Sequence, residues 1–553
     1  MKMRIGMLEY IVEQTRLFLE DMPKSKRKKK GQFFTSADTA KFMSEMFDIS
    51  SCGDEITVLD PGSGTGILAV AFIDQIISVL HDVHISLTCY ETDEDVLPIL
   101  KANLRYIKEL LGDRLDYEIL EEDYILSQSN DFDENLLASI DPRKYDYIIS
   151  NPPYLRIMRD DPAALAMPRV VHGAPNLYFL FASMSLFNLK PEAQMVYIIP
   201  RSWTSGAYFK AFREYLLTVG KIEQIHLFVS RDKVFNSEDV LQETMIIKIR
   251  KTSNNPSEVL ITSSNSSSDF DGISSLKVPY DAVVSGEDLY VYLPTSEEEI
   301  NVIKKVNMYH TTLPEQGLKM KTGIVVDFRQ WNELRKEPGE HILPLFYSQH
   351  IRDGRVNHQP SGKEYDWIVD EKPGLIQKNK NYVFIKRFTA KEERRRLQCG
   401  VYSPDDFKEY KYIGTQNKIN FVDKVDGSEM DAQTTYGVYA LLNSTLFDMY
   451  YRILNGSTQV NSTEINNIPV PPVSMIKKIG EQILMTKDLS TDNCDRIISE
   501  VAYAENSRET FRKKAMHRFR TAALIEDNGK ATNSPNYRYR ITDEALSVLS
   551  VCL

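Results

Sequence analysis

The sequence is poor in cysteine, and it lacks long apolar runs. Its 553 residues include five cysteines, widely spaced and without a CxxC pair, which argues against a disulfide framework or a structural zinc site. The nine histidines form neither an HExxH motif nor a cluster, so no metal is implied. No run approaches the roughly 18 apolar residues of a membrane span. Glu9, Glu13 and Arg16 occupy the segment where a signal peptide would be apolar, so we expect a cytoplasmic protein.

An overall positive charge is also missing. The formal net charge is −11, which is unusual for a protein that binds nucleic acid unless basic side chains gather locally. Residues 24–30, KSKRKKK, hold six basic side chains in seven positions, and residues 372–418 hold twelve Lys or Arg against five Asp or Glu. Each cluster is either a solvated face or a nucleic-acid contact, and composition alone leaves both open.

Composition divides the chain into several parts, since its length exceeds what one hydrophobic core usually supports. Apolar strand-like runs alternate with helical patterns up to about residue 252, the rhythm of an α/β domain with a parallel or mixed sheet. We expect the following organisation: an N-terminal helix and basic segment (1–30), the α/β domain (31–252), a Ser/Asn-rich linker (253–289), an aromatic-rich α+β domain (290–473) and a helical C-terminal region with a small terminal element (474–553).

A glycine-rich turn follows one of the predicted strands. In VLDPGSGTG, residues 58–66, the strand ends at Asp60 and a helix is predicted from Ile67. Three glycines at alternating positions allow the backbone to approach a ligand closely: Gly62, Gly64 and Gly66. Ile67 stands where a dinucleotide fingerprint would have its third glycine, so a nicotinamide or flavin site is not indicated. Taken alone, the motif is also compatible with a simple tight turn.

Acidic residues end the next two predicted strands. Glu91 follows ISLTCY and could accept hydrogen bonds from the two hydroxyls of a ribose. Asp123 and Tyr124 end a third strand, where the acid could accept from an adenine amino group and the aromatic ring could cover the base. Each of these side chains, considered singly, is equally compatible with a solvated strand end.

The strand YIIS runs directly into Asn151, Pro152, Pro153 and Tyr154. Two consecutive prolines end a strand, because neither donates to the ladder and each fixes φ near −65°. The sequence therefore predicts a rigid corner that presents an amide at the carboxyl end of a strand. Open α/β sheets bind their ligands at that edge.

The order of these motifs resembles that of class I, S-adenosylmethionine-dependent amino-methyltransferases that act on DNA. GQFFTSADTA (residues 31–40) before the glycine turn, and LYFLF, VYIIPRSW and VFNSEDV after the Asn-Pro-Pro-Tyr corner, are similar to the gamma subclass that makes N6-methyladenine. The resemblance implies a Rossmann-like domain with a mixed seven-stranded sheet and S-adenosyl-L-methionine as cofactor. The cofactor residues that it implies are Phe33, Thr35, Asp60, Pro61, Gly62, Gly64, Gly66, Glu91, Asp123, Tyr124 and Asn151.

The same corner supplies the expected catalytic groups. The adenine amino nitrogen is a poor nucleophile because its lone pair is delocalised into the ring. The side-chain oxygen of Asn151 and the carbonyl of Pro152 can accept from the amino hydrogens, while Pro153 keeps that carbonyl rigid. The family pattern implies that Tyr154 and Phe235 hold the extruded base between them. No covalent intermediate is needed, and the loop contains no cysteine.

The second domain resembles the target-recognition region of restriction–modification methyltransferases, with TGIVVDFR (residues 322–329) as one shared stretch. PKSKRKKKGQFFT and the terminal NSPNYRYRIT are most similar to BsuBI/PstI-type modification methylases. The resemblance implies double-stranded DNA as substrate, with CTGCAG as a candidate site, and a cognate endonuclease that need not bind this chain. The residues expected to contact DNA are Lys386, Arg387, Arg394, Arg395 and Arg396.

Parts of the sequence are also compatible with three other functions. PDDFKEYK, residues 404–411, nominally matches a PD-(x)3-ExK nuclease motif, although its acids are unusually close together for a restriction endonuclease or a nuclease–methylase fusion. A non-enzymatic DNA-specificity subunit would not need the glycine turn and the Asn-Pro-Pro-Tyr corner. The same tetrapeptide occurs in RNA and protein-glutamine methyltransferases, but these do not need the large second domain.

Overall fold

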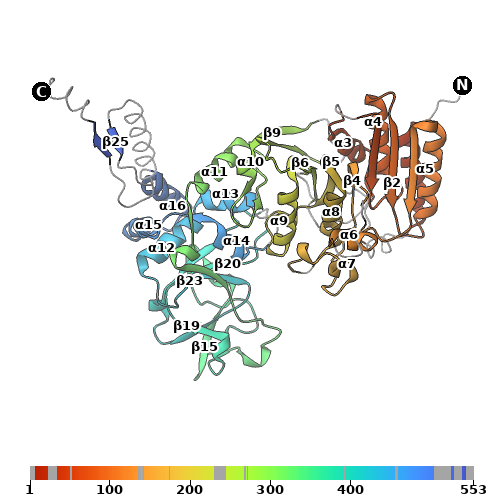
Figure 1. The fold of residues 1–553 in the computed structure, drawn as a ribbon. Helices are drawn as coiled ribbons and strands as arrows, with labels where there is room; N and C mark the ends of the chain where they lie inside the picture. The colour runs from red at the N-terminus through yellow and green to blue at the C-terminus, as the bar shows by residue number, and fades with distance from the viewer. Residues whose placement is uncertain are drawn as a thin grey trace. The chain divides into compact units, whose positions relative to one another are not determined.

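The computed structural model describes residues 6–22, 31, 34–49, 53–134, 139, 142–173, 175–228, 244–266, 270, 272–390, 393–454, 459–503, 525–527 and 539–542. Contacts divide the chain into two compact units (Figure 1). The first comprises Met1–Met308, Ala390–Glu392 and Met449–Asn467, and the second comprises Tyr309–Thr389, Glu393–Asp448 and Ile468–Leu553.

The first unit is built on one mixed sheet, which Figure 1 shows running from β2 through β4 and β5 to β9. In spatial order its strands are β3 (Leu115–Leu120), β2 (His84–Tyr90), β1 (Glu55–Asp60), β4 (Tyr145–Ser150), β5 (Leu189–Pro200), β7 (Thr244–Arg250), β6 (Lys221–Phe228), β8 (Glu258–Ser264) and β9 (Ser274–Pro279). Strands β3 to β5 are parallel, and β7 lies antiparallel between β5 and β6. The predicted Rossmann-like class I methyltransferase fold is confirmed, although the sheet has nine strands in the described residues rather than seven.

Helices flank the sheet and bury apolar side chains in the core of the first unit. They are α1 (Met7–Asp21), α3 (Ala37–Glu45), α4 (Ile67–Val79), α5 (Leu97–Leu111), α8 (Leu177–Asn188) and α9 (Lys210–Val219). The first half of α4, residues 67–73, is buried throughout, because this helix packs under the sheet where α1 and α3 also contact it. Burying such side chains stabilises the fold by about 1.5–3 kcal/mol each. This packing fixes the glycine turn that precedes α4.

The segment expected to be a linker, residues 253–289, is instead part of the first unit. It contains β8 and β9, which extend the sheet, followed by α10 (Tyr280–Val283) and β10 (Val284–Ser285). The polar composition of β8 has a structural cause, because the buried ring of His226 in β6 hydrogen-bonds Thr262 (2.9 Å) and Ser264 (3.0 Å). Serine and threonine here satisfy a buried histidine rather than mark a loop.

The boundary of the second domain also differs from the expectation of residues 290–473. The helix α11 (Glu297–Asn307) belongs to the first unit, as do the end of α13 (Thr445–Leu454) and α14 (Ser462–Asn467). Buried polar side chains hold the returning segment: the Tyr450 hydroxyl donates to Asn307 (2.8 Å), and Glu464 accepts from the Ser205 hydroxyl (3.1 Å). Composition could not reveal this return of the chain.

Within the described residues, the second unit contains two large sheets and two smaller strand pairs. One has the order β13 (Leu318–Thr322), β23 (Ile419–Lys424), β20 (Tyr382–Lys386), β21 (Cys399–Tyr402), β17 (Arg355–Val356) and β16 (Ile351–Arg352). The other has the order β14 (Leu334–Arg335), β18 (Trp367–Val369), β15 (Ile342–Phe346), β22 (Tyr412–Thr415) and β19 (Ile376–Lys378). The helices α12 (Ala432–Leu442), α15 (Val473–Thr486) and α16 (Thr491–Ile498) pack together, and the described part of the terminal element is the strand pair β25 (Ile525–Asp527) and β26 (Tyr539–Ile541).

Among the described residues, the structure has no helix that is both long enough and apolar enough to cross a membrane.

Candidate functional site

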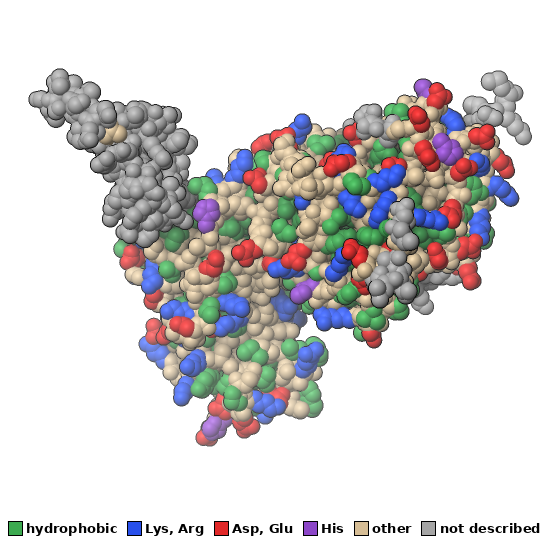
Figure 2. All heavy atoms as spheres, viewed as in Figure 1, with side chains coloured by type: hydrophobic (Ala, Val, Ile, Leu, Met, Phe, Trp, Pro, Cys, Tyr) green, Lys and Arg blue, Asp and Glu red, His purple; other side chains and the backbone are tan. Residues whose placement is uncertain are grey.

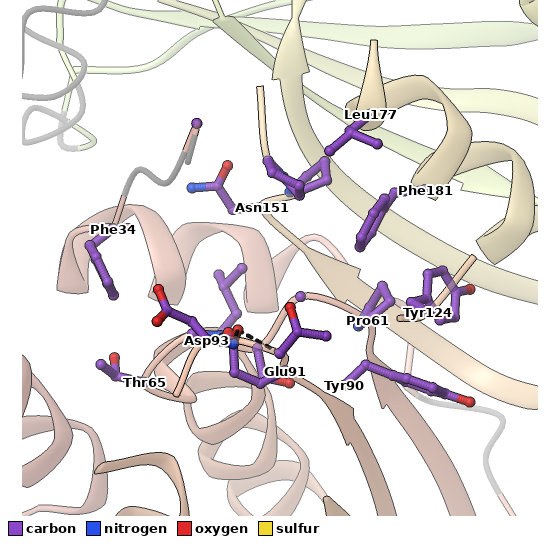
Figure 3. Close-up of a pocket in the computed structure, with 18 of the residues that line it drawn as sticks. Phe34, Pro61, Thr65, Tyr90, Glu91, Asp93, Tyr124, Asn151, Leu177 and Phe181 are labelled. Carbon is purple, nitrogen blue, oxygen red and sulfur yellow. Dashed lines mark hydrogen bonds between the residues drawn. The ribbon is translucent and has the colours of Figure 1, made fainter. Parts of the chain in front are cut away.

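A cavity of about 480 Å³ lies at the carboxyl ends of β1, β2, β3 and β4 (Figure 3). It brings together ten of the predicted site residues: Thr35, Pro61, Gly62, Gly64, Glu91, Asp123, Tyr124, Asn151, Pro152 and Pro153. These residues come from five separate stretches of sequence. Their convergence follows from the parallel order of the strands, which places successive carboxyl ends at one edge of the sheet.

The glycine turn forms the floor of the cavity by exposing its backbone. The N–H of Ser63 donates to the carbonyl of Tyr90 (3.0 Å), and the N–H of Gly64 donates to the Glu91 carboxylate (2.9 Å). Gly64 has φ +53° and Gly66 has φ +87°, conformations that residues with a Cβ rarely adopt. The turn is therefore fixed to the end of β2 in a shape that favours glycine.

Glu91 is one of four acidic residues that line the cavity, with Asp93, Glu122 and Asp123. One of its oxygens accepts from Gly64, and the other accepts from the N–H groups of Thr92 (2.8 Å) and Asp93 (2.8 Å). Burial raises the pKa of the Glu91 carboxyl above its ordinary value, and these N–H groups oppose that shift. Three of the four lone-pair sites of the carboxylate are therefore occupied, and the oxygen that accepts from Gly64 keeps one for a ligand hydroxyl. Glu91 can thus organise the turn and bind one ribose hydroxyl at once.

Aromatic side chains line two sides of the cavity. Figure 3 shows Phe181, Tyr124 and Tyr90 on one side of the cavity and Phe34 on the other. Tyr124 is only 2% exposed; its ring lies 5.3 Å from that of Phe181, and its hydroxyl donates to Asn188 (2.8 Å). Tyr124 thus contributes an edge of the wall, and the more accessible Phe181 is better placed to cover a flat ligand.

Asn151 extends from the end of β4 toward the cavity (Figure 3). Its Nδ2 donates to the Thr35 hydroxyl (3.1 Å), which fixes the orientation of the amide. With the nitrogen engaged in this way, the side-chain oxygen is the atom that can accept from an amino group. GQFFT and the Asn-Pro-Pro-Tyr corner are therefore in direct contact.

The corner is braced by Gly31, which begins GQFFT. The carbonyl of Gly31 accepts from the N–H of Tyr154 (3.0 Å). Gly31 has φ +67°, and a Cβ there would lie 3.0 Å from the carbonyl carbon of Tyr154. A glycine at this position allows the close backbone approach and the unusual conformation together.

Several predicted residues lie outside the cavity wall. Asp60 and Gly66 support the turn from below, since Asp60 is fully buried and Gly66 contacts Leu100 in α5. The Tyr154 hydroxyl donates to the carbonyl of Ile198 (2.9 Å), and its ring meets Tyr178 edge-on. Its role in stacking stays a prediction. Phe33 and Phe235 lie outside the described residues.

Other cavity residues were not among the predicted site residues. In the sequence, Phe34 cannot be distinguished from its neighbour Phe33, and Phe181 lies in LYFLF, a motif whose position alone assigns it no role. The remaining unpredicted lining residues are Gly31, Ser63, Thr65, Ile67, Leu68, Tyr90, Thr92, Asp93, Glu122, Leu155 and Leu177.

Of the arginines expected to contact DNA, Arg396 is misassigned. It is fully buried, and its Nε donates to the Thr389 hydroxyl (3.1 Å) while its backbone N–H donates to Asp448 (2.8 Å). Arg395 is half-buried and donates to the carbonyl of Ser444 (3.0 Å). Both side chains stabilise the interior of the second unit.

Three basic residues remain as candidates for contact with DNA. Arg394 is exposed, while Lys386 and Arg387 are half-buried.

In the nominal nuclease motif, Asp405 forms an ion pair with Lys408 (3.3 Å). Within the described residues, no group of three or more His, Cys, Asp or Glu is arranged to hold a metal ion.

Asp60 gives a prediction about stability. Burial, and secondarily the nearby charge of Glu91, raises the pKa of the Asp60 carboxyl to about 8. Between about pH 4 and pH 8 the folded state therefore keeps a proton that the unfolded state releases, so stability falls as pH rises through this window. Asp60→Asn is neutral at every pH, and we expect its thermal unfolding midpoint to exceed that of the wild type by more at pH 8 than at pH 5.

The matched control is Asp54→Asn, at the exposed opposite end of the same strand. It should leave the difference between the two pH values unchanged. An equal gain for Asp60→Asn at both pH values would contradict the raised pKa.

The comparisons with known proteins agree with this architecture. Residues 69–235 match the model of the Eco57I restriction-modification methylase family, and residues 471–552 match the BsuBI/PstI restriction endonuclease HTH domain. The chain is 32% identical to Type II methyltransferase M.BsuBI of Bacillus subtilis, covering 86% of this chain and 93% of that protein. It is also 32% identical to Type II methyltransferase M.PstI of Providencia stuartii, and that alignment covers 83% of this chain and 90% of M.PstI. The solved structure of the Type IIL restriction-modification enzyme MmeI in complex with DNA covers 90% of this chain and 75% of its own, with TM-score 0.47 and 12% identity.

Proposed function

The chain belongs to the type II methyltransferases of restriction–modification systems, and from this premise we propose that it transfers a methyl group from S-adenosyl-L-methionine to N6 of adenine in a short duplex sequence. The observation that carries the proposal is the position of Asn151, which lines the same cavity as the glycine turn and Glu91. An amide acceptor beside a nucleoside-type pocket suits an exocyclic amino group as the methyl acceptor.

The residues of the cavity fit S-adenosyl-L-methionine. Glu91 can accept from a ribose hydroxyl, the backbone of the glycine turn allows close approach of the amino-acid part, and Phe181 can cover the adenine ring. The Asp123 Oδ1 accepts from the N–H groups of Ile125 and Leu126 (2.9 Å each), which leaves its other oxygen for the amino group of the cofactor. When bound, the cofactor supplies an electrophilic methyl group.

The protein contributes orientation and electrostatics to the transfer. As the target nitrogen pyramidalises, the Asn151 oxygen and the Pro152 carbonyl accept hydrogen bonds from its two N–H groups and stabilise the positive charge that develops there. Thr35 holds the amide of Asn151, and Gly31 holds the backbone that follows, so little reorganisation is needed during the reaction. Because adenine N6 is inside the duplex, the nucleotide must be extruded, at a cost of a few kcal/mol.

The decisive experiment is methylation of plasmid DNA with labelled cofactor, followed by strand-resolved mapping of N6-methyladenine. We expect modification at one short sequence, and CTGCAG is the first to test because of the similarity to M.BsuBI and M.PstI. Label at cytosine, or label incorporated into RNA or protein but not DNA, would contradict the proposal. Incubating the protein with unmethylated DNA and Mg²⁺ tests the nuclease alternative. That alternative would be supported if the wild type cut the DNA at specific sites and Asp405→Ala did not.

The cellular role that we propose is protection of DNA from a cognate restriction endonuclease that cuts the same site. The enzyme would work in the cytoplasm, where the DNA is. Expression of the active chain should make plasmid DNA resistant to an endonuclease specific for the mapped sequence.

A further inference from the structure

A loop in the second unit exposes two large aromatic side chains. We call residues 324–331, which follow β13, the aromatic loop. Phe328 is 78% exposed and Trp331 is 64% exposed, and Ile324 at the start of the loop is 40% exposed. Exposed apolar side chains that gather in one place are typical of an interaction surface. Phe328 lies within the motif TGIVVDFR.

The aromatic loop is held firmly despite its exposure. Its backbone pairs with the neighbouring turn: the N–H of Val325 donates to Thr415 (2.9 Å), and the N–H of Asn417 donates to Val325 (2.8 Å). A Cβ at Gly323 would lie 2.2 Å from the carbonyl oxygen of Gln416, so glycine is required for this approach. Phe328 is therefore presented by a braced turn, which lowers the entropy lost when it binds a partner.

The tip of the aromatic loop has its own internal bonds. The N–H of Val326 donates to the Gln330 side chain (2.7 Å), and the N–H of Arg329 donates to the carbonyl of Val326 (2.9 Å). The acid in the loop, Asp327, accepts from the Gln416 side chain (3.3 Å). These contacts close the turn on either side of Phe328 and leave its ring exposed.

Basic side chains and a third aromatic residue lie on the adjoining turns. The N–H of Arg387 donates to the carbonyl of Lys418 (2.9 Å), and its guanidinium donates to the carbonyl of Asn417 (3.0 Å), which places the end of β20 beside the turn that braces the aromatic loop. Phe388 is 45% exposed, and Lys418 is also exposed.

In each turn an arginine accompanies an aromatic ring. The Cζ of Arg329 is 5.5 Å from the ring centroid of Phe328, and that of Arg387 is 5.6 Å from the centroid of Phe388. Figure 2 shows hydrophobic and basic side chains next to one another at the surface of this unit, around the strands that Figure 1 labels β15 and β19. Rings accompanied by cations complement stacked bases bordered by phosphates.

We propose that Phe328 is a stacking wedge for duplex DNA: its ring contacts base faces, while Arg329 and Arg387 contact the flanking phosphates. The proposal deepens the proposed DNA methyltransferase function and rests on it. Charge favours DNA over an apolar protein partner, because cations accompany both turns in a chain whose net charge is −11. Apolar side chains that enter a base step unstack it and bend the duplex.

The test measures affinity for a duplex that contains the mapped methylation site. We expect Phe328→Ala to weaken binding about tenfold, in line with the loss of one base–aromatic contact. Phe328→Tyr keeps the ring and should restore most of the affinity. The matched control is Val425→Ala, which removes a 55% exposed apolar side chain next to the other end of β23 and should leave affinity unchanged.

Salt dependence separates stacking from phosphate contact. Phe328→Ala should leave the slope of log K against log[salt] unchanged, whereas Arg329→Gln should reduce its magnitude by about one. Thermal unfolding midpoints of all variants should stay close to the wild type, because the replaced side chains are exposed.

The outcomes distinguish the wedge from the proposed function. If the wild type methylates adenine at one sequence but Phe328→Ala binds and methylates equally well, the wedge is refuted and the methyltransferase function stands. Equal losses in Phe328→Ala and Val425→Ala would also refute it, because a general surface effect would then explain both. If the wild type neither binds nor methylates duplex DNA, both proposals fail.

Discussion

Asn151→Ala is expected to lower the single-turnover rate of adenine methylation by on the order of 10²–10³, as the loss of one preorganised acceptor does at oxyanion holes. The substitution removes the side-chain oxygen but leaves the glycine turn, Glu91 and the second unit in place. The loss should therefore fall on the chemical step, with DNA affinity unchanged. Rapid-quench measurement under saturating cofactor and DNA gives the rate. Methylation at the wild-type rate would refute the catalytic role of the corner.

Asn151→Asp is the sharper variant because of its contact with Thr35. In the wild type the Thr35 hydroxyl accepts from Nδ2, and in the aspartate variant the same hydroxyl can rotate to donate to a carboxylate oxygen. An acceptor oxygen remains for the amino group, so we expect activity between those of the wild type and Asn151→Ala. Adding Thr35→Val should lower that residual activity further. A residual activity of Asn151→Asp no greater than that of Asn151→Ala would contradict this account.

The cavity was largely predictable from the sequence, for a physical reason. Its central polar groups, Glu91 and Asn151, directly follow strands β2 and β4, and in a parallel sheet the strand order alone brings these ends together. Asn151 and Glu91 are 60 positions apart in the sequence, yet they could be assigned to one site for this reason. The side-chain orientations were not predictable, because they depend on contacts such as that between Thr35 and Asn151.

The errors share a cause as well. Arg396 was assigned to DNA contact and the serines of β8 to a linker because of their residue types. The type of a residue does not reveal whether its side chain is buried. A guanidinium that bonds Thr389 inside the unit resembles, in sequence, one that contacts phosphate. Likewise Ser264 is polar because it bonds the buried His226, whereas composition suggested a linker. Local composition cannot distinguish a polar group that faces solvent from one that satisfies a buried partner.

Aromatic residues show the same limit. Phe328 and Phe181 are equally apolar in sequence, yet one is 78% exposed and the other is 9% exposed in the cavity wall. The difference arises from the braced turn around Phe328 and from the packing of α8 around Phe181. The sequence indicated which regions carry function, and the contacts were needed to assign the side chains.

The second large effect is expected for cofactor affinity in Glu91→Gln. The wild-type carboxylate accepts from three backbone N–H groups, those of Gly64, Thr92 and Asp93. A glutamine offers only one acceptor oxygen, and its NH₂ would face at least one of these donors, so the turn loses a bond in addition to the ribose contact. A lost bond to a charged buried group typically costs about 1–3 kcal/mol. We therefore expect the Kd for S-adenosyl-L-methionine to rise roughly 10- to 100-fold, measured by isothermal titration calorimetry.

Two further variants test whether the loss of cofactor affinity is specific to the Glu91 carboxylate. Glu91→Ala removes both oxygens and should weaken binding at least as much, while Glu94→Ala, an exposed acid in the same segment, should leave the Kd unchanged. Because burial raises the pKa of Glu91, protonation removes the carboxylate at a pH above that of an ordinary glutamate, so wild-type affinity should fall on mild acidification. The glutamine of Glu91→Gln does not titrate in this pH range, so the cofactor affinity of the variant should not fall on mild acidification. A Kd in Glu91→Gln equal to that of the wild type would mean that the acid neither holds the glycine turn in its binding shape nor contacts the ribose.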